Sequence, residues 1–329
     1  MIGILGVGSY LPEAEVSNAE IAERTGVTEE WILRKTKIES RRFAAADEAT
    51  SDLAAKAGRA ALASAGLTPA DIDMIVVSTS TPDSPQPPTA CLVQHLLDAR
   101  KAAAFDINVV CSGFVYALEL ARALVTARPD QRVLVVAADL YSRSLDFGDR
   151  RTAVLLGDGA GAAVVGAAGD GYGIQHIELA ARGDLQHLIR VEAGGTRLPA
   201  SPETVANGGH FFRMEGRLVR EFVIEQVPRM LARFVAHAGV APADIAHIVP
   251  HQPNGVLLDE LDKLAGFPEA RMHRTVERYG NVGSASVPVT LDAAHRGGAL
   301  GDGDLILLTA FGGGMTTGNC LLRWQKVST

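Results

Sequence analysis

An internal repeat is the feature of this sequence that most restricts how the chain can fold. Residues 65–77 read AGLTPADIDMIVV and residues 238–250 read AGVAPADIAHIVP, with eight of thirteen positions identical at an offset of 173. The same offset carries the apolar run 131–137 onto 304–310, and Cys111 onto Ser284. Three matches at one offset indicate a duplicated structural unit.

Each copy has the same predicted order of elements. An amphipathic helix (51–65 and 220–238) ends in Ala-Gly, and an Ile- and Val-rich strand (73–79 and 247–250) follows. A second helix, another buried strand, a glycine-rich turn and a last strand complete the unit. This alternation predicts an α/β fold of βαβ units with mostly parallel sheets covered on both faces. We expect halves at 1–170 and 171–329 with a site between them, and a loop insertion over residues 180–215.

Composition and charge exclude several classes of protein. A net charge of -7 without a basic block argues against a nucleic-acid partner. No stretch reaches the roughly 18 apolar residues of a membrane span, and the apolar N-terminus lacks the basic flank of a signal peptide. The chain contains 3 cysteines, an odd number without paired spacing. This argues against a disulfide framework and a metal site, and it fits the reducing cytoplasm.

Cys111 is the candidate nucleophile. It precedes a helix predicted over 112–127, where the positive end of the helix dipole would favour the thiolate and lower the thiol pKa. Gly113 would let a ligand approach closely. The residues alone leave open a packing role for Cys111, which is the role we expect for Cys91 and Cys320.

His251 and Asn281 are the other candidates for chemistry. His251 follows strand 247–250, and the carboxyl ends of parallel strands are where α/β folds place ligand-facing residues. Asn281 lies three residues before Ser284, the repeat image of Cys111, and should face the same central region. Taken separately, the histidine fits a capped surface position and Gly280-Asn281 fits a turn.

Together these motifs resemble the ketoacyl-acyl-carrier-protein synthase III family, the initiating condensing enzymes of fatty-acid synthesis, and their secondary-metabolism relatives. The resemblance is collinear over essentially the whole chain. It implies a thiolase-like fold, an α-β-α-β-α sandwich of duplicated halves, and a homodimer that pairs strands equivalent to 103–107. The matching segments are 30–32, 106–113, 157–162, 250–254, 280–281 with 284–286, and 311–314.

The resemblance also implies a mechanism. Cys111, activated by the helix dipole, takes an acyl group from acyl-CoA, and the N–H groups of Cys111 and Gly313 hold the oxyanion. His251 and Asn281 donate hydrogen bonds to the enolate that forms when malonyl-acyl carrier protein or malonyl-CoA loses carbon dioxide. The coenzyme A thioester is a substrate, and no cofactor is expected.

Three further residues resemble positions that bind coenzyme A. Trp31 and Arg150 match the pair that sandwiches the adenine, and Asn254 matches a residue that hydrogen-bonds the pantetheine arm. The alternatives are a helix-packing role for Trp31, a surface ion pair for Arg150 and a helix N-cap for Asn254.

The sequence departs from the family pattern in ways that indicate a specialised branch. Lys37 replaces the usual glycine after the Trp31 helix, and Gly255-Val256 replace the usual Leu-Arg, whose arginine docks the acyl carrier protein. Candidates to compensate for that arginine are Arg213, Arg217 and Arg220.

Two other functions fit a chain of this kind. An acyltransferase could move the group from Cys111 to an alcohol or amine, but such relatives tend to carry an acid in place of Asn281. A non-catalytic partner subunit would typically have lost Cys111. The sequence therefore favours condensation and leaves the acyl chain and the acceptor open.

Overall fold

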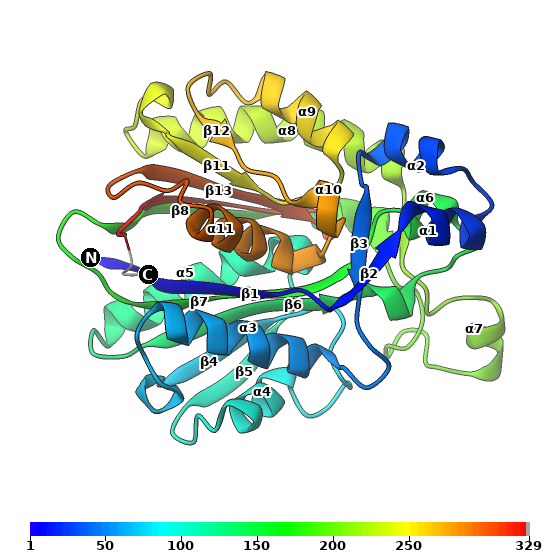
Figure 1. Ribbon diagram of the computed structural model, residues 1–329, viewed down its shortest axis with the longest axis horizontal. Helices are drawn as coiled ribbons and strands as arrows, with labels where there is room; N and C mark the ends of the chain where they lie inside the picture. Colours follow the sequence, from blue (N-terminus) through cyan, green and yellow to red (C-terminus); the bar gives the residue numbers. More distant parts are fainter. Residues whose placement is uncertain (327–329) are drawn as a thin grey trace.

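Two five-stranded sheets with the same strand order form the frame of the molecule. The computed structural model describes residues 1–326. In each sheet the first strand of that half lies at one edge, and the strand that repeats at the offset of 173 lies next to the other edge (Figure 1). The first sheet has the order β1 (Ile2–Tyr10), β7 (Asp158–Ala167), β6 (Val133–Leu140), β4 (Met74–Ser78), β5 (Ala103–Ile107). The second has the order β8 (Gly173–Ala181), β14 (Thr316–Arg323), β13 (Leu305–Gly312), β11 (His247–Pro250), β12 (Arg271–Met272).

The expectation of mostly parallel sheets is wrong. In the first sheet β4 pairs in parallel with β5 and β6, but β7 pairs antiparallel with both β6 and β1. The second sheet repeats this arrangement. The βαβ units are present in each half. In the second half the glycine turn after Gly312 folds the chain directly back into β14, whereas in the first half residues 141–157 connect β6 to β7 and the expected glycine turn lies mostly within β7.

Six helices complete a five-layer α-β-α-β-α sandwich (Figure 1). Side chains of β4 alternate between layers, because Ile75 and Val77 pack toward α3 and α4 whereas Val76 packs toward α5. The helices are α3 (Thr50–Ser64) and α4 (Thr89–Leu97) on one outer face, α5 (Gly113–Ala127) and α11 (Ser286–Arg296) between the sheets, and α8 (Gly216–His237) and α9 (Gly255–Leu264) on the other outer face.

The central helix α5 corrects one expectation from the sequence. Residues Val110–Ala127 are long and apolar enough to cross a membrane by length and composition, so such a stretch does exist. In the fold, Phe114, Leu118 and Ala121 of this helix are completely buried in the cluster that joins both sheets. Its apolar composition therefore reflects a core helix that is covered on both sides.

Smaller elements cover the end of the sandwich where the strands β6 and β13 finish. The segment 180–215, expected to be a loop, contains a short helix and a two-stranded ribbon. These elements are β2 (Ala14–Ser17), α1 (Asn18–Thr25), α2 (Glu29–Thr36), β3 (Ser40–Phe43), α6 (Arg150–Ala153), β9 (Ile189–Arg190), α7 (Pro202–Ala206), β10 (Arg213–Met214) and α10 (Val276–Tyr279).

Candidate active site

Two short 3-10 turns meet at the centre of the molecule. The turn η2 (Val110–Ser112) leads into α5, and η6 (Gly283–Ala285) leads into α11, at the same offset as the sequence repeat. The two turns contact each other, and η2 also contacts β13. The candidate site therefore lies between the two halves, at the carboxyl ends of β6 and β13.

The backbone around Cys111 is shaped for close approach. Val110 has a φ of 48°, a left-handed conformation that costs a β-branched residue about 1–2 kcal/mol. A methyl group on Gly312 would lie 2.8 Å from both the Cβ and the backbone nitrogen of Cys111. The neighbouring Gly313 packs against Val110, where an added Cβ would lie 3.3 Å from Val110 Cγ2. Both glycines let the end of β13 lie directly beside the candidate nucleophile.

The expected low pKa of the Cys111 thiol is wrong for the free protein. Burial raises the pKa of Cys111, and the buried carboxylate of Asp139 raises it further. Cys111 also lies in η2, so it precedes the first residue of α5 and receives less from the helix dipole than expected. The free protein therefore holds Cys111 as a thiol, so a reaction at its sulfur would need a group that accepts the proton.

His251 is held rigidly at the end of β11. Its backbone N–H donates to Thr309 O at 2.8 Å, and its ring packs edge-on against Phe311 with centroids 5.4 Å apart. Its Nδ1 lies 3.0 Å from the hydroxyl oxygen of Ser286. Burial lowers the pKa of His251 to about 3, so the ring is neutral at physiological pH.

Asn281 is fixed through its backbone and one end of its side chain. Its N–H donates to Leu155 O at 2.8 Å, and its carbonyl accepts from Gly157 N at 2.9 Å. The side-chain Oδ1 accepts from Gly283 N at 2.9 Å. Because the oxygen is occupied, the amide nitrogen is the end that can donate to a ligand.

A channel and a cavity approach these residues. The channel has a volume of about 230 Å³, and the cavity of about 720 Å³ lies beside Val110, the residue before Cys111. This geometry would admit an extended arm through the channel and an acyl group in the cavity. The residues that line the channel include Lys35, Arg151, Leu155, Met214, Val219, Arg220, Asn254, Val256 and Asn281, and those that line the cavity include Val110, Tyr141, Ile189, Phe212 and the loop 82–85.

The three candidate coenzyme A contacts lie near the channel side of the molecule. Asn254 lines the channel and is also the N-cap of α9, where its side chain accepts from Leu257 N at 2.9 Å. The guanidinium carbon of Arg150 lies 5.6 Å from the centroid of the Trp31 ring. A purine stacked between these two groups needs about 7 Å, twice the contact distance of roughly 3.5 Å, so the pair must open slightly to sandwich an adenine.

Two of the departures from the family pattern compensate each other. Lys37 has a φ of 58°, the left-handed conformation that normally favours glycine at a helix C-cap, and its side chain forms an ion pair with Asp259. A Cβ on Gly255 would lie 2.7 Å from Lys37 Cβ. The side chain at position 37 therefore occupies space that a larger residue at 255 would need.

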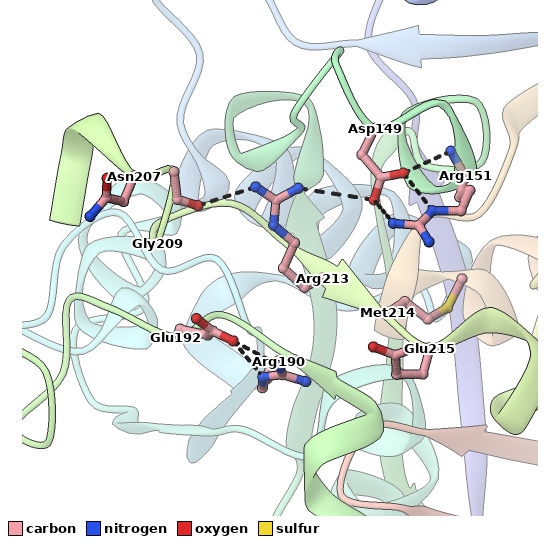
Figure 2. Close-up of a pocket in the computed structure, with 10 residues that line it drawn as sticks. Asp149, Arg151, Arg190, Glu192, Asn207, Gly209, Arg213, Met214 and Glu215 are labelled. Carbon is pink, nitrogen blue, oxygen red and sulfur yellow. Dashed lines mark hydrogen bonds and ion pairs between the residues drawn. The ribbon is translucent and has the colours of Figure 1, made fainter.

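The arginines proposed to replace the missing carrier-docking arginine all have acidic partners. Arg213 pairs with Asp146 at 2.8 Å, Arg217 with Glu221 at 3.8 Å and Arg220 with Glu260 at 2.6 Å. Figure 2 shows Arg213 and Arg151 both reaching Asp149 in the cleft next to the channel.

Neither of the other two cysteines matches Cys111. Cys320 is buried, which confirms its packing role, but Cys91 is exposed in the first turn of α4, so a packing role for it is wrong. The Asp106 carboxylate accepts hydrogen bonds from Thr89 N and Ala90 N at 2.7 Å each. This carboxylate offsets the positive end of α4 next to Cys91.

Sequence reasoning missed two residues of the site, Asp139 and Ser286. Asp139 is completely buried and accepts from Ser80 N at 2.8 Å and from Ser284 N at 2.8 Å. The repeat could have pointed to both residues, because each is a polar residue whose counterpart in the other half, at the offset of 173, is a glycine. Asp139 corresponds to Gly312, and Ser286 corresponds to Gly113.

The comparisons with known proteins agree with this geometry. A model for 3-oxoacyl-[acyl-carrier-protein (ACP)] synthase III matches residues 105–183, and a model for the C terminal part of the same enzyme matches residues 235–324. An acetoacetyl CoA synthase of Streptomyces sp. (strain CL190) is 52% identical, over 98% of each chain. A beta-ketoacyl-[acyl-carrier-protein] synthase III of Caldanaerobacter subterraneus subsp. tengcongensis is 42% identical, also over 98% of each chain. The solved 3-oxoacyl-[acyl-carrier-protein] synthase III from Aquifex aeolicus superposes with a TM-score of 0.90 at 35% identity, covering 98% of this chain and 100% of the other.

Proposed function

Because the chain belongs to the 3-oxoacyl-[acyl-carrier-protein] synthase III family, we propose that it joins an acetyl group to malonyl-CoA and releases acetoacetyl-CoA. The chain is an acyltransferase that carries out an acyl-CoA-primed, decarboxylative Claisen condensation with a malonyl thioester. The observation that carries the finer proposal is the 52% identity to an acetoacetyl CoA synthase over nearly the whole of both chains.

The proposed steps use the residues at the junction of the two halves. The Cys111 sulfur attacks the acetyl thioester, and the N–H groups of Cys111 and Gly313 stabilise the oxyanion before coenzyme A leaves. Malonyl-CoA then loses carbon dioxide, while Asn281 and His251 donate hydrogen bonds to the enolate oxygen. The enolate carbon attacks the acetyl group, the Cys111 thiolate leaves, and acetoacetyl-CoA is released. A neutral His251 suits this role because the charge appears only in the transition state.

The acidic partners of the surface arginines support malonyl-CoA as the acceptor. An acyl carrier protein is attracted over long distances by unneutralised positive charge. Arg213, Arg217 and Arg220 each lie beside a carboxylate, so their summed field is weak.

The remaining parts of the proposal concern coenzyme A and assembly. We infer that Trp31, Arg150 and Asn254 bind the coenzyme, that the reaction needs no further cofactor, and that the protein works in the cytoplasm. The chain would form a homodimer through β5, because this strand is an edge of the first sheet and pairs only with β4 among the described strands.

The test compares acceptors in one assay. Purified protein is incubated with acetyl-CoA and either malonyl-CoA or malonyl-acyl carrier protein, and the products are identified by mass spectrometry. We expect kcat/KM for malonyl-CoA to exceed that for the carrier protein by about 10-fold or more, a difference of about 1.4 kcal/mol. Arg217→Ala, which removes a paired arginine that lines neither the channel nor the cavity, should leave this ratio unchanged. A higher kcat/KM for the carrier protein in the wild type would overturn the choice of acceptor.

A further inference from the structure

The hydroxyl group of Ser286 lies between His251 and a backbone carbonyl. Ser286 is the first residue of α11 and is completely buried. Its Oγ lies 2.6 Å from Gly283 O and 3.0 Å from His251 Nδ1. The hydroxyl has one proton, so it can donate to only one of these two groups at a time.

Proton counting assigns the donor in each contact. A carbonyl oxygen carries no proton, so the 2.6 Å contact to Gly283 O requires the proton of Ser286. The Ser286 oxygen must then accept from His251, which places the single proton of the neutral ring on Nδ1. Nε2 is therefore left with a lone pair.

The first half of the molecule lacks this contact. At the offset of 173, Ser78 corresponds to His251 and Gly113 corresponds to Ser286. A Cβ on Gly113 would lie 1.7 Å from Ser78 Oγ, so no side chain fits there. The contact between a serine hydroxyl and the residue that follows the strand therefore occurs only in the half that carries His251.

Two consecutive residues at the end of β13 contact the two candidate catalytic residues, His251 and Cys111. Phe311, whose ring packs against His251, is followed by Gly312, which packs directly on Cys111. The protonated thiol of Cys111 needs a proton acceptor during acylation, and a lone pair on His251 Nε2 supplies one.

We propose that Ser286 is a positioning residue that holds the His251 proton on Nδ1 in the free enzyme, so that Nε2 accepts the Cys111 proton during acylation. The proposal rests on the proposed function. The S–H bond of Cys111 breaks and its proton moves to Nε2 while the sulfur bonds to the thioester carbon. The bond from that carbon to the coenzyme A sulfur then breaks, and the departing sulfur takes the proton back from Nε2. Thiolate and imidazolium form together, and each charge stabilises the other.

Decarboxylation requires the other tautomer, with the proton on Nε2. The ring loses its Nδ1 proton to water and takes one from water at Nε2, and Ser286 permits this exchange by turning its hydroxyl from Gly283 O to His251 Nδ1. Gly283 O remains satisfied because it also accepts the backbone N–H of Ser286. The free enzyme is thus set for acylation, and the ring changes tautomer before condensation.

The test measures the tautomer and the two half-reactions separately. Nitrogen-15 NMR of histidine-labelled protein should show a protonated Nδ1 and an unprotonated Nε2 for His251, with the signals assigned through their loss in His251→Gln. In Ser286→Ala the population should move toward protonated Nε2. Acylation by acetyl-CoA should slow by about 10-fold, because general base catalysis contributes about 10²–10⁴ and is only partly lost. Carbon dioxide release by pre-acylated enzyme should stay within about 2-fold.

Two further variants distinguish positioning from structural loss. Ser286→Thr retains the hydroxyl and should restore the wild-type tautomer and acylation rate. Thr290→Val removes the next buried hydroxyl of α11, which bonds Thr275 at 2.7 Å, and should change neither half-reaction. A protonated Nε2 in the wild type, or a Ser286→Ala variant slowed in decarboxylation instead of acylation, would overturn the proposal. If the wild type forms no carbon–carbon bond, the proposed function fails, while the NMR spectrum still decides the role of Ser286.

Discussion

The turns η2 and η6 occupy equivalent places in the two halves, yet only η2 carries a nucleophile. In η6, Ser284 N–H donates to the carboxylate of Asp139 at 2.8 Å. In η2, the corresponding residue Cys111 faces Gly312, the repeat image of Asp139, which has no side chain. The Asp139 carboxylate therefore occupies the N–H of Ser284 in η6, whereas no side chain that the structure describes takes the equivalent place beside the N–H of Cys111 in η2. The difference supports the proposal that the N–H of Cys111 binds a substrate oxygen.

Closing the open turn should have the largest effect. Gly312→Ala places a methyl group 2.8 Å from the Cys111 nitrogen, so it should displace the nucleophile and cover the N–H. Loss of one oxyanion donor costs about 10²–10³ in rate, and we expect acylation to fall by at least that factor. Intact-mass measurement of acyl-enzyme formation checks this. Gly183→Ala is the control, because its added Cβ meets no atom within 4 Å.

The left-handed residue that begins each turn gives the next largest effect. Gly283 has a φ of 57°, and a Cβ there would lie 2.4 Å from Asp139 Oδ2 and 2.5 Å from Tyr141 Cε2. Overpacking costs about 1–3 kcal/mol and the left-handed backbone about 1–2 kcal/mol more. Urea unfolding of Gly283→Ala should show a loss of about 3 kcal/mol. An unchanged midpoint would mean that the packing of η6 has been misjudged.

The equivalent strands β4 and β11 also end differently. His251 follows β11 at the position that corresponds to Ser78 at the end of β4. The pKa of folded His251 is lowered to about 3, against an ordinary value near 6.5. Above pH 6.5 the ring is neutral in both states, so its contribution to stability is complete there. As the pH falls from 6.5 toward 3, only the unfolded chain gains the proton, and stability is lost, by about 2 kcal/mol at pH 5. His251→Gln should flatten the fall in unfolding free energy between pH 7 and pH 5.

Val110→Gly should have the smallest effect. It relieves a left-handed valine, but glycine loses more backbone entropy on folding, so the unfolding free energy should change by less than about 1 kcal/mol. Chemical denaturation of this variant, measured beside Gly283→Ala, shows whether the two positions are as unequal as their contacts indicate. A loss above about 2 kcal/mol would show that the Val110 side chain matters more than its strain.

Much of this architecture could be predicted from the repeat. The offset of 173 relates η2 to η6 and α5 to α11 residue for residue, and the shared strand order follows it. The antiparallel direction of β7 and β14 could not be predicted, because both strands are buried on both faces, as parallel strands are.

The site was only partly accessible from the sequence. Its glycines could be recognised in motifs, but the raised pKa of the Cys111 thiol depends on burial and on Asp139, a residue far away in the chain. Side-chain contacts between residues distant in the chain, such as Ser286 with His251, have no periodic pattern that a sequence would display.

The measurement that tests the central claim most directly is a pair of single-turnover assays on Asn281 variants. If Asn281 stabilises an enolate, Asn281→Ala should acylate Cys111 at nearly the normal rate. The same variant should lose carbon–carbon bond formation by about 10²–10³, or ~3–4 kcal/mol, because only decarboxylation places charge at that oxygen. Asn281→Asp should be at least as damaging, since a carboxylate opposes the developing negative charge. The account predicts normal acylation with little carbon dioxide release in both variants. Full turnover of Asn281→Asp without release of carbon dioxide from malonyl-CoA would contradict it and would identify transfer to an alcohol or amine instead.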